Sequence, residues 1–238
     1  MPLPEGVRAV LLDIEGTTTP LAFVEEVLFP YARERLEEAA ARAAEDPELA
    51  AAIGRLRAEH EAERRQGGAG DLPDFGDGAP YARYLMAADR KSTGLKELQG
   101  LIWRRGYEDG SLEGQLFPDV PEALAGWRRD GVRLRIYSSG SVLAQELLFG
   151  HTPHGDLTPF LEGFHDTRTG PKKEPESYRR IAADMDLPPE AILFLSDSVE
   201  ELDAAREAGL RTALAVRPGN RPARASSHPR YGSFTELT

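Results

Sequence analysis

The chain has 238 residues, of which 40% are hydrophobic and 29% are charged, a balance typical of a globular protein with a full core. Its formal net charge of −11 argues against a nucleic-acid or anionic membrane partner. It contains no cysteine, which excludes disulfides, thiolate nucleophiles and cysteine zinc sites. No apolar run approaches the roughly 20 residues of a membrane helix, and no signal-type segment opens the sequence. We therefore expect a cytoplasmic protein.

The first segment of interest is "AVLLDIEGTTTP", residues 9–20. An apolar run typical of a buried strand ends on Asp13, and Glu15 and Gly16 follow. Period-two alternation places the side chains of Asp13 and Glu15 on the same side if the strand geometry persists. Gly16 permits a sharp turn that other residues resist. The pattern predicts two carboxylates at the rim of a sheet, beside free turn N–H groups.

Residues 21–115 differ in composition from the rest of the chain. They are rich in Ala, Glu and Arg, a composition typical of helices. Four breaks in the helical pattern are expected: near Pro30, near Pro47, at a loop over residues 67–80 and near "KSTG". No strand pattern is visible in this range. We interpret residues 21–115 as a helical insert.

Three later segments, at 132–141, 191–198 and 211–216, again read as strands, and the first two end on polar turns. Helical patterns lie between them; one has Pro121 near its start and Gly131 after its end, and another begins at a possible Ser141 N-cap. Strands alternating with helices predict an α/β fold, a doubly wound parallel sheet of Rossmann-like type. We expect residues 1–20 and 116–238 to form this core around the inserted helical domain.

Polar residues follow three of the expected strands. In an open parallel sheet, ligands bind beyond the carboxyl ends of the strands, so Asp13, Ser138, Ser139 and Asp197 should converge on one crevice. Clustered with Glu15, the two aspartates would repel each other, and a hard divalent cation such as Mg²⁺ resolves that repulsion.

The same edge suits a phosphate group. The hydroxyls and turn N–H groups of Ser138–Gly140, with the following helix N-terminus, match phosphate oxygens. Lys172, in "TGPKKEPESY", precedes a helix and could supply a point charge. Asp13 would then be a nucleophile and Glu15 a general acid/base.

The order of "DIEGT", "YSSGS", a lysine before a helix and "FLSD" resembles the four motifs of haloacid dehalogenase-like phosphotransferases. Most phosphatases of that superfamily carry Asp where this chain has Glu15. The segments "LLDIEGTTTPLAFVEEVLFPYA", "LQGLIWRRGY", "IYSSGSVLAQELLFGHT", "SYRRIAADM" and "VRPGN" resemble the enolase-phosphatases of methionine salvage. The resemblance covers most of the chain and is weakest at about 35–80.

The resemblance implies a role for each matching residue. Asp13 would be the nucleophile and a Mg²⁺ ligand, Glu15 would be catalytic and bind Mg²⁺ in the family manner, and Asp197 would be the remaining protein ligand of one Mg²⁺ per subunit. Ser138, Ser139 and Lys172 would bind the substrate.

The family's substrate is a small phosphorylated diketone, 2,3-diketo-5-methylthiopentyl-1-phosphate, which is enolised and then dephosphorylated to acireductone. The helical insert corresponds to the family's cap, which closes over the substrate. The family suggests a monomer.

Several alternatives stay open from the sequence. Lys173 could replace Lys172, the serines could be ordinary turn residues, and Glu201 reads as first-turn helix charge rather than as a ligand. The enolisation base is Glu15 or a residue of the insert. A phosphatase of the same superfamily acting on another small phosphomonoester is the nearest rival function. A phospho-accepting receiver module is disfavoured by the position of Asp13 on the first strand.

Overall fold

A computed structural model of the chain describes residues 3–66, 72–90, 92–220, 222 and 224–237. The chain divides into two compact units, one made of Met1–Val24 and Glu113–Thr238 and the other of Glu25–Leu112. The boundaries expected from the sequence fall at residues 20 and 115.

The first unit is built on a six-stranded sheet in the order β3-β2-β1-β4-β5-β6, and every pairing is parallel. The predicted α/β class and parallel sheet are confirmed. β1 is flanked by β2 and β4, so Leu12 pairs with both Ile136 and Leu195. The strands are β1 (Ala9–Leu12), β2 (Arg133–Tyr137), β3 (Gly163–His165), β4 (Ile192–Ser196), β5 (Arg211–Ala215) and β6 (Arg230–Tyr231). The sequence did not suggest β3 and β6, which are very short.

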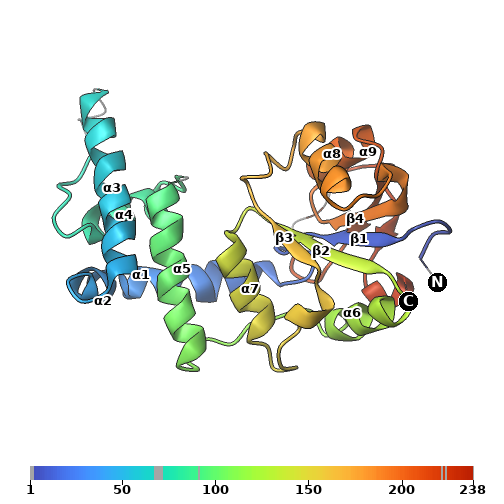
Figure 1. Ribbon diagram of the computed structural model, residues 1–238, viewed down its shortest axis with the longest axis horizontal. Coiled ribbons are helices and arrows are strands. Elements are labelled where there is room, and N and C mark those ends of the chain that lie inside the picture. The colour runs from blue at the N-terminus through green and yellow to red at the C-terminus, as the bar shows by residue number, and fades with distance from the viewer. Residues whose placement is uncertain (1–2, 67–71, 91, 221, 223, 238) are drawn as a thin grey trace. The chain divides into compact units, whose positions relative to one another are not determined.

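Helices cover both faces of this sheet: α8 and α9 lie over one face and α6 lies over the other (Figure 1). Ser141 caps α7 as expected, because its hydroxyl accepts a hydrogen bond from Ala144 N. The longer helices are α6 (Val120–Arg129), α7 (Val142–Gly150), α8 (Pro175–Asp184) and α9 (Val199–Glu207). Short 3-10 turns span Thr158–Phe160, Pro189–Ala191 and Phe234–Leu237.

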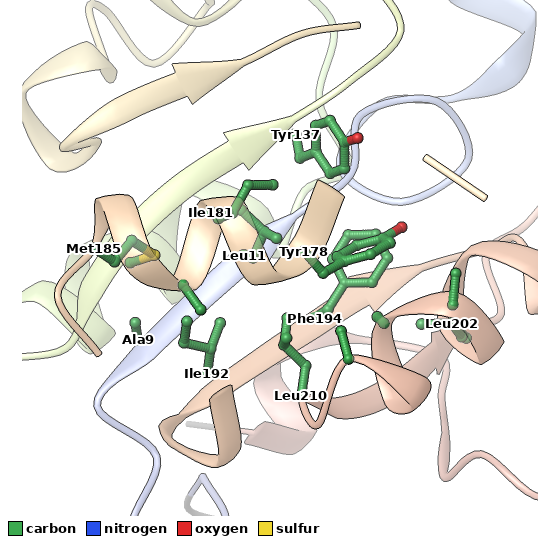
Figure 2. Close-up of a cluster of buried hydrophobic side chains, with 14 of the residues drawn as sticks. Ala9, Leu11, Tyr137, Tyr178, Ile181, Met185, Ile192, Phe194, Leu202 and Leu210 are labelled. Carbon is green, nitrogen blue, oxygen red and sulfur yellow. The ribbon is translucent and has the colours of Figure 1, made fainter. Parts of the chain in front are cut away.

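The layer between the sheet and α8/α9 is a dense apolar core (Figure 2). Leu11 of β1 and Phe194 of β4 pack against Tyr178 and Ile181 of α8, and all four side chains are inaccessible to solvent. Alternate residues of β1 face opposite layers, which explains why its whole run is apolar. A sheet held from both sides gives its carboxyl edge a rigid base.

The second unit is helical, and its described residues contain no strand, in agreement with the expectation for this region. A π-helical segment (Phe23–Leu28) leads into α1 (Phe29–Glu34), followed by α2 (Leu36–Arg42), α3 (Pro47–Arg65), α4 (Ala79–Ala87) and α5 (Thr93–Glu108). The expected breaks are present: α1 begins one residue before Pro30, and α3 begins at Pro47. Near "KSTG", Ser92 caps α5 and bonds to Glu59, while Lys91 lies outside the described residues. None of the helices described is both long and apolar enough to cross a lipid bilayer.

Candidate active site

Asp13 is the meeting point of three distant segments at the carboxyl edge of the sheet. It follows β1, is almost fully buried, and donates its N–H to Leu195 O. Its Oδ1 accepts hydrogen bonds from Ile14 N at 2.7 Å and from Lys172 Nζ at 2.6 Å. Its Oδ2 lies 3.0 Å from the hydroxyl of Ser196 at the end of β4. The expected approach of the lysine to this carboxylate is therefore present.

Lys172 bridges two carboxylates. Its Nζ lies 2.6 Å from Asp13 Oδ1 and 2.6 Å from Glu201 Oε2, and only 9% of its side chain is exposed. Burial opposes the charge, but the carboxylates of Asp13 and Glu201 hold the pKa of Lys172 above its usual value. The neighbouring Lys173 is two-thirds exposed and lies 3.8 Å from Glu200. The geometry thus favours Lys172 over Lys173 as the cation of the site.

Glu201 has a role that the sequence did not reveal. It lies in the first turn of α9, as expected, but its side chain contacts Lys172 and lies 3.0 Å from the Ser196 hydroxyl. Burial and the charge of Asp13 raise its pKa to about 7. Helical side chains lean toward the N-terminus, so an acid four residues after Asp197 is directed back at the strand end. The spacing of four residues between Asp197 and Glu201 was the one feature of the sequence that could have indicated this contact.

Asp197 interlocks with the turn after β1. Gly16 has a left-handed φ of 68°, and a Cβ there would collide with the Asp197 carboxylate. The Asp197 N–H donates to the Thr17 hydroxyl at 3.0 Å. Asn220 donates its amide to Gly16 O at 2.7 Å and lies 3.4 Å from Asp197 Oδ2. Glycine is therefore required at position 16 both for its backbone conformation and for the space that Asp197 occupies.

Negative charge exceeds positive charge at this edge. Burial and the charge of Asp13 raise the pKa of Asp197 to about 7, and Glu15 adds to the effect. Asp13 and Glu201 share the buried ammonium of Lys172, whose charge also acts on Asp197 without cancelling the rise in its pKa. Hard oxygen donors with excess negative charge fit a divalent cation, and Mg²⁺ commonly binds through one or two carboxylates and several waters. Within the described residues, no group of three or more acidic, His or Cys side chains is arranged to hold a metal ion, so waters and main-chain oxygens would have to complete the coordination of a cation here.

The turn Ser138–Gly140, which follows β2, is held in place by hydrogen bonds to buried groups. Ser138 is buried; its N–H donates to His165 O, and its hydroxyl accepts from Gly140 N at 3.1 Å. The Gln145 amide donates to both Gly140 O and His165 O, at 2.9 Å each. Ser139 is exposed at the turn. The structure thus holds the turn rigidly beside the end of β1, as the pairing of β1 with β2 requires.

Arg217 is a second residue that sequence reasoning missed. Its guanidinium is buried and donates to Thr17 O at 2.9 Å, Asp119 Oδ2 at 2.8 Å and Gly232 O at 3.0 Å. Together with Asn220, Arg217 holds two successive carbonyls of the turn after β1. Both residues lie in "VRPGN", a segment noted only for its resemblance, and their contacts cross about 200 positions of sequence.

Comparison with known proteins shows the family to which the chain belongs. A family model for haloacid dehalogenase-like hydrolases matches residues 7–209. The chain is 49% identical to enolase-phosphatase E1 of Synechococcus elongatus over 242 aligned positions, covering 100% of both chains. The chain belongs to the enolase-phosphatase family of haloacid dehalogenase-like hydrolases. Enolase-phosphatase E1 of Pseudomonas aeruginosa is 45% identical over 97% of this chain and 98% of its own length. The crystal structure of the UTR4 protein of Saccharomyces cerevisiae has a TM-score of 0.80 and 33% identity, covering 97% of this chain and all of that one.

Membership of the enolase-phosphatase family confirms the predicted resemblance, the predicted fold class and the predicted enzyme class. The protein is a hydrolase of the phosphatase type.

Proposed function

We propose that the protein converts 2,3-diketo-5-methylthiopentyl-1-phosphate to acireductone and phosphate in methionine salvage. Support comes from the similarity to enolase-phosphatase E1 over the whole chain and from the carboxylate–lysine arrangement at the sheet edge. The proposal includes a monomeric protein acting in the cytoplasm on a small phosphorylated substrate.

Asp13 is the proposed nucleophile. An oxygen of its carboxylate attacks phosphorus in line, the bond from phosphorus to the substrate oxygen breaks, and an aspartyl-phosphate forms. Covalent catalysis of this kind divides one difficult displacement into two easier ones. Lys172, 2.6 Å from Asp13 Oδ1, is close enough to pair with a phosphate oxygen beside the attacking carboxylate. It would offset charge on the equatorial oxygens, where positioning and electrostatics dominate phosphoryl transfer.

The proposed ligands of one Mg²⁺ are the carboxylates of Asp13 and Asp197, together with Glu15, which would bind the ion in the family manner and keep its carboxyl group for proton transfer. The excess of buried negative charge around Asp197 supports this assignment. When bound, the cation neutralises charge on the transferring phosphoryl group and on an enolate oxygen of the substrate.

Glu15 is the proposed general acid and base. It donates a proton to the leaving enol oxygen in the first step. In the second step it accepts a proton from the water that attacks the aspartyl-phosphate, and free phosphate leaves. Proton transfer of this kind contributes about 10²–10⁴-fold to rate. Glu15 is half-buried, and it is one candidate for the base that first enolises the diketone.

Ser138 and Ser139 are the proposed phosphate-binding residues. The turn that carries them precedes α7, and turn N–H groups at a helix N-terminus favour anions. The bonds from Gln145 to Gly140 O and His165 O keep that turn in place without help from a ligand.

The strongest single support for the proposal is the buried contact between Lys172 and Asp13. These two residues are 159 positions apart in the sequence, yet the lysine ammonium lies beside the carboxylate. The test is a proton NMR assay with the diketone phosphate that follows enol formation and phosphate loss separately. We expect both steps, with kcat/KM at least about 10²-fold higher than for simple phosphate esters.

The nearest rival is a phosphatase of the same superfamily with a different phosphomonoester as substrate. Comparable turnover of a simple ester and the diketone phosphate, without detectable enol, would establish that rival. Absence of phosphate release from every ester would refute both functions.

A further inference from the structure

The loop that carries Lys172 is fastened by three side-chain hydroxyls. Tyr137 donates to Gly170 O at 2.8 Å, Ser177 donates to Pro171 O at 2.7 Å, and Tyr178 donates to Lys172 O at 2.6 Å. Three successive carbonyls thus each accept from a different hydroxyl. All three donors are 1% exposed or less.

This segment cannot hold itself by regular secondary structure. It lies between β3 and α8, and Pro171 has no N–H to donate. Gly170 has a φ of 150°, and a Cβ there would collide with the side chain of Ser177. The loop is therefore pressed against the first turn of α8. Pro171 O also accepts from Glu174 N at 3.1 Å, and the phenol hydroxyls satisfy the carbonyls of Gly170 and Lys172.

The two phenol rings that supply the outer bonds are fixed in the core. The ring of Tyr137 packs edge-to-face on that of Tyr178 with centroids 5.5 Å apart, and Tyr178 packs on Phe194 at 5.1 Å. Figure 2 shows both hydroxyls directed away from the end of the cluster where Ala9 and Met185 lie. Since neither ring has room to move, each hydroxyl is held at a set point of the sheet's carboxyl edge.

The Tyr137 ring also lies under the lysine side chain, with Lys172 Nζ 5.7 Å from its centroid. A cation within about 6 Å of an aromatic face is attracted to it. Burial raises the pKa of both Tyr137 and Tyr178, so both phenols stay protonated and keep donating at neutral pH.

We propose that Tyr178 and Tyr137 are positioning residues of the phosphatase reaction, which hold the main chain of Gly170–Lys172 and thereby set the Lys172 ammonium against Asp13. The inference rests on the proposed function. The lysine side chain extends from a backbone point that Tyr178 holds directly, so a shift of the loop is carried to Nζ. A misplacement of about 1 Å at a reacting centre can cost up to about 10²-fold in rate.

The test removes one oxygen and keeps the ring. Tyr178→Phe and Tyr137→Phe are each compared with Tyr81→Phe. Tyr81 lies in the helical unit, is 2% exposed and donates to Glu63 at 3.0 Å, so it is a buried tyrosine hydroxyl without a link to the lysine loop. All three substitutions should lower thermal stability to a similar degree, because each removes one hydrogen bond.

The expected difference lies in two other measurements. With the diketone phosphate, kcat should fall about 10-fold or more in Tyr178→Phe, with a smaller change in KM, and should stay unchanged in Tyr81→Phe. In ¹H–¹⁵N spectra of the lysine ammonium groups, the Lys172 signal should shift or broaden in Tyr178→Phe and not in Tyr81→Phe.

An unchanged Lys172 signal or an unchanged kcat in Tyr178→Phe overturns the inference and leaves the proposed function intact. If Tyr178→Phe does not fold, the same two readouts on Tyr137→Phe decide. If the wild-type protein releases phosphate from no ester, the proposed function fails, and the ammonium signal alone then decides whether the tyrosines hold Lys172.

Discussion

The ion pairs of the helical unit and those at the carboxyl edge of the sheet differ in how far their side chains are exposed to water. In the helical unit, ion pairs join side chains that are mostly 37–60% exposed, namely Arg55–Glu97, Arg83–Glu37 and Arg105–Glu38. At the carboxyl edge of the sheet, Lys172 pairs with Asp13 and Glu201, and these side chains are only 9%, 7% and 14% exposed. In these pairs of the helical unit, water can replace a lost partner, so each pair contributes little to stability. At the sheet edge the charges are buried, so each charge depends on its partner for compensation.

The difference teaches which charges to read as functional. An exposed ion pair contributes about 0–1 kcal/mol to stability. For buried charges, the free energy lost on removing them from water can exceed the free energy gained from their attraction. A cluster of buried carboxylates around one lysine is thus a poor way to stabilise a fold and a good way to bind a cation and an anionic substrate. Three experiments test this contrast.

The largest effect is expected from Asp13→Asn. Asparagine has the same shape but cannot attack phosphorus, so phosphate release should fall by at least about 10⁴-fold. The fold should survive, because Glu201 still pairs with Lys172. Phosphate release and thermal unfolding by circular dichroism measure the two effects. Glu200→Gln, which removes an exposed acid of α9, is the matched control and should keep wild-type activity. Near-normal turnover in Asp13→Asn would rule out this nucleophile.

Removal of divalent metal should have the next largest effect. After treatment with EDTA, turnover should drop to a few per cent or less, and added Mg²⁺ should restore it, because the carboxylates around Asp197 need a compensating cation. Mg²⁺ should also raise the melting temperature, since a ligand that binds only the folded state stabilises it. Asp197→Asn should weaken that stabilisation. Full activity after exhaustive chelation would contradict the metal site.

The gathering of these residues was predictable from the sequence for a physical reason. Parallel strands end at the same edge, so Asp13, Ser138 and Asp197 had to converge once the apolar runs before them were read as strands. The strands β3 and β6 were missed because three and two residues carry no periodicity. Glu201 and Arg217 were missed because their roles depend on contacts with distant segments, and local sequence shows only a helix turn and a loop.

The last experiment compares the same substitution in a buried and an exposed ion pair. Arg217 has 2% of its side chain exposed and pairs with Asp119, which also accepts from Phe234 N and Ser233 Oγ. Arg217→Met leaves the Asp119 carboxylate without its cation and Thr17 O without its donor. The free energy of unfolding should fall by about 3–5 kcal/mol, measured by urea denaturation.

Arg83→Met is the matched control in the helical unit, and it is the smallest effect expected. Arg83 pairs with Glu37, and 39% and 60% of these side chains are exposed, so water replaces the lost partner. The bond to Arg83 lowers the pKa of Glu37, but solvent screens most of that interaction. The free energy of unfolding should change by less than about 1 kcal/mol. Equal losses in Arg83→Met and Arg217→Met would show that burial does not separate the two kinds of ion pair, and the contrast between the units would fail.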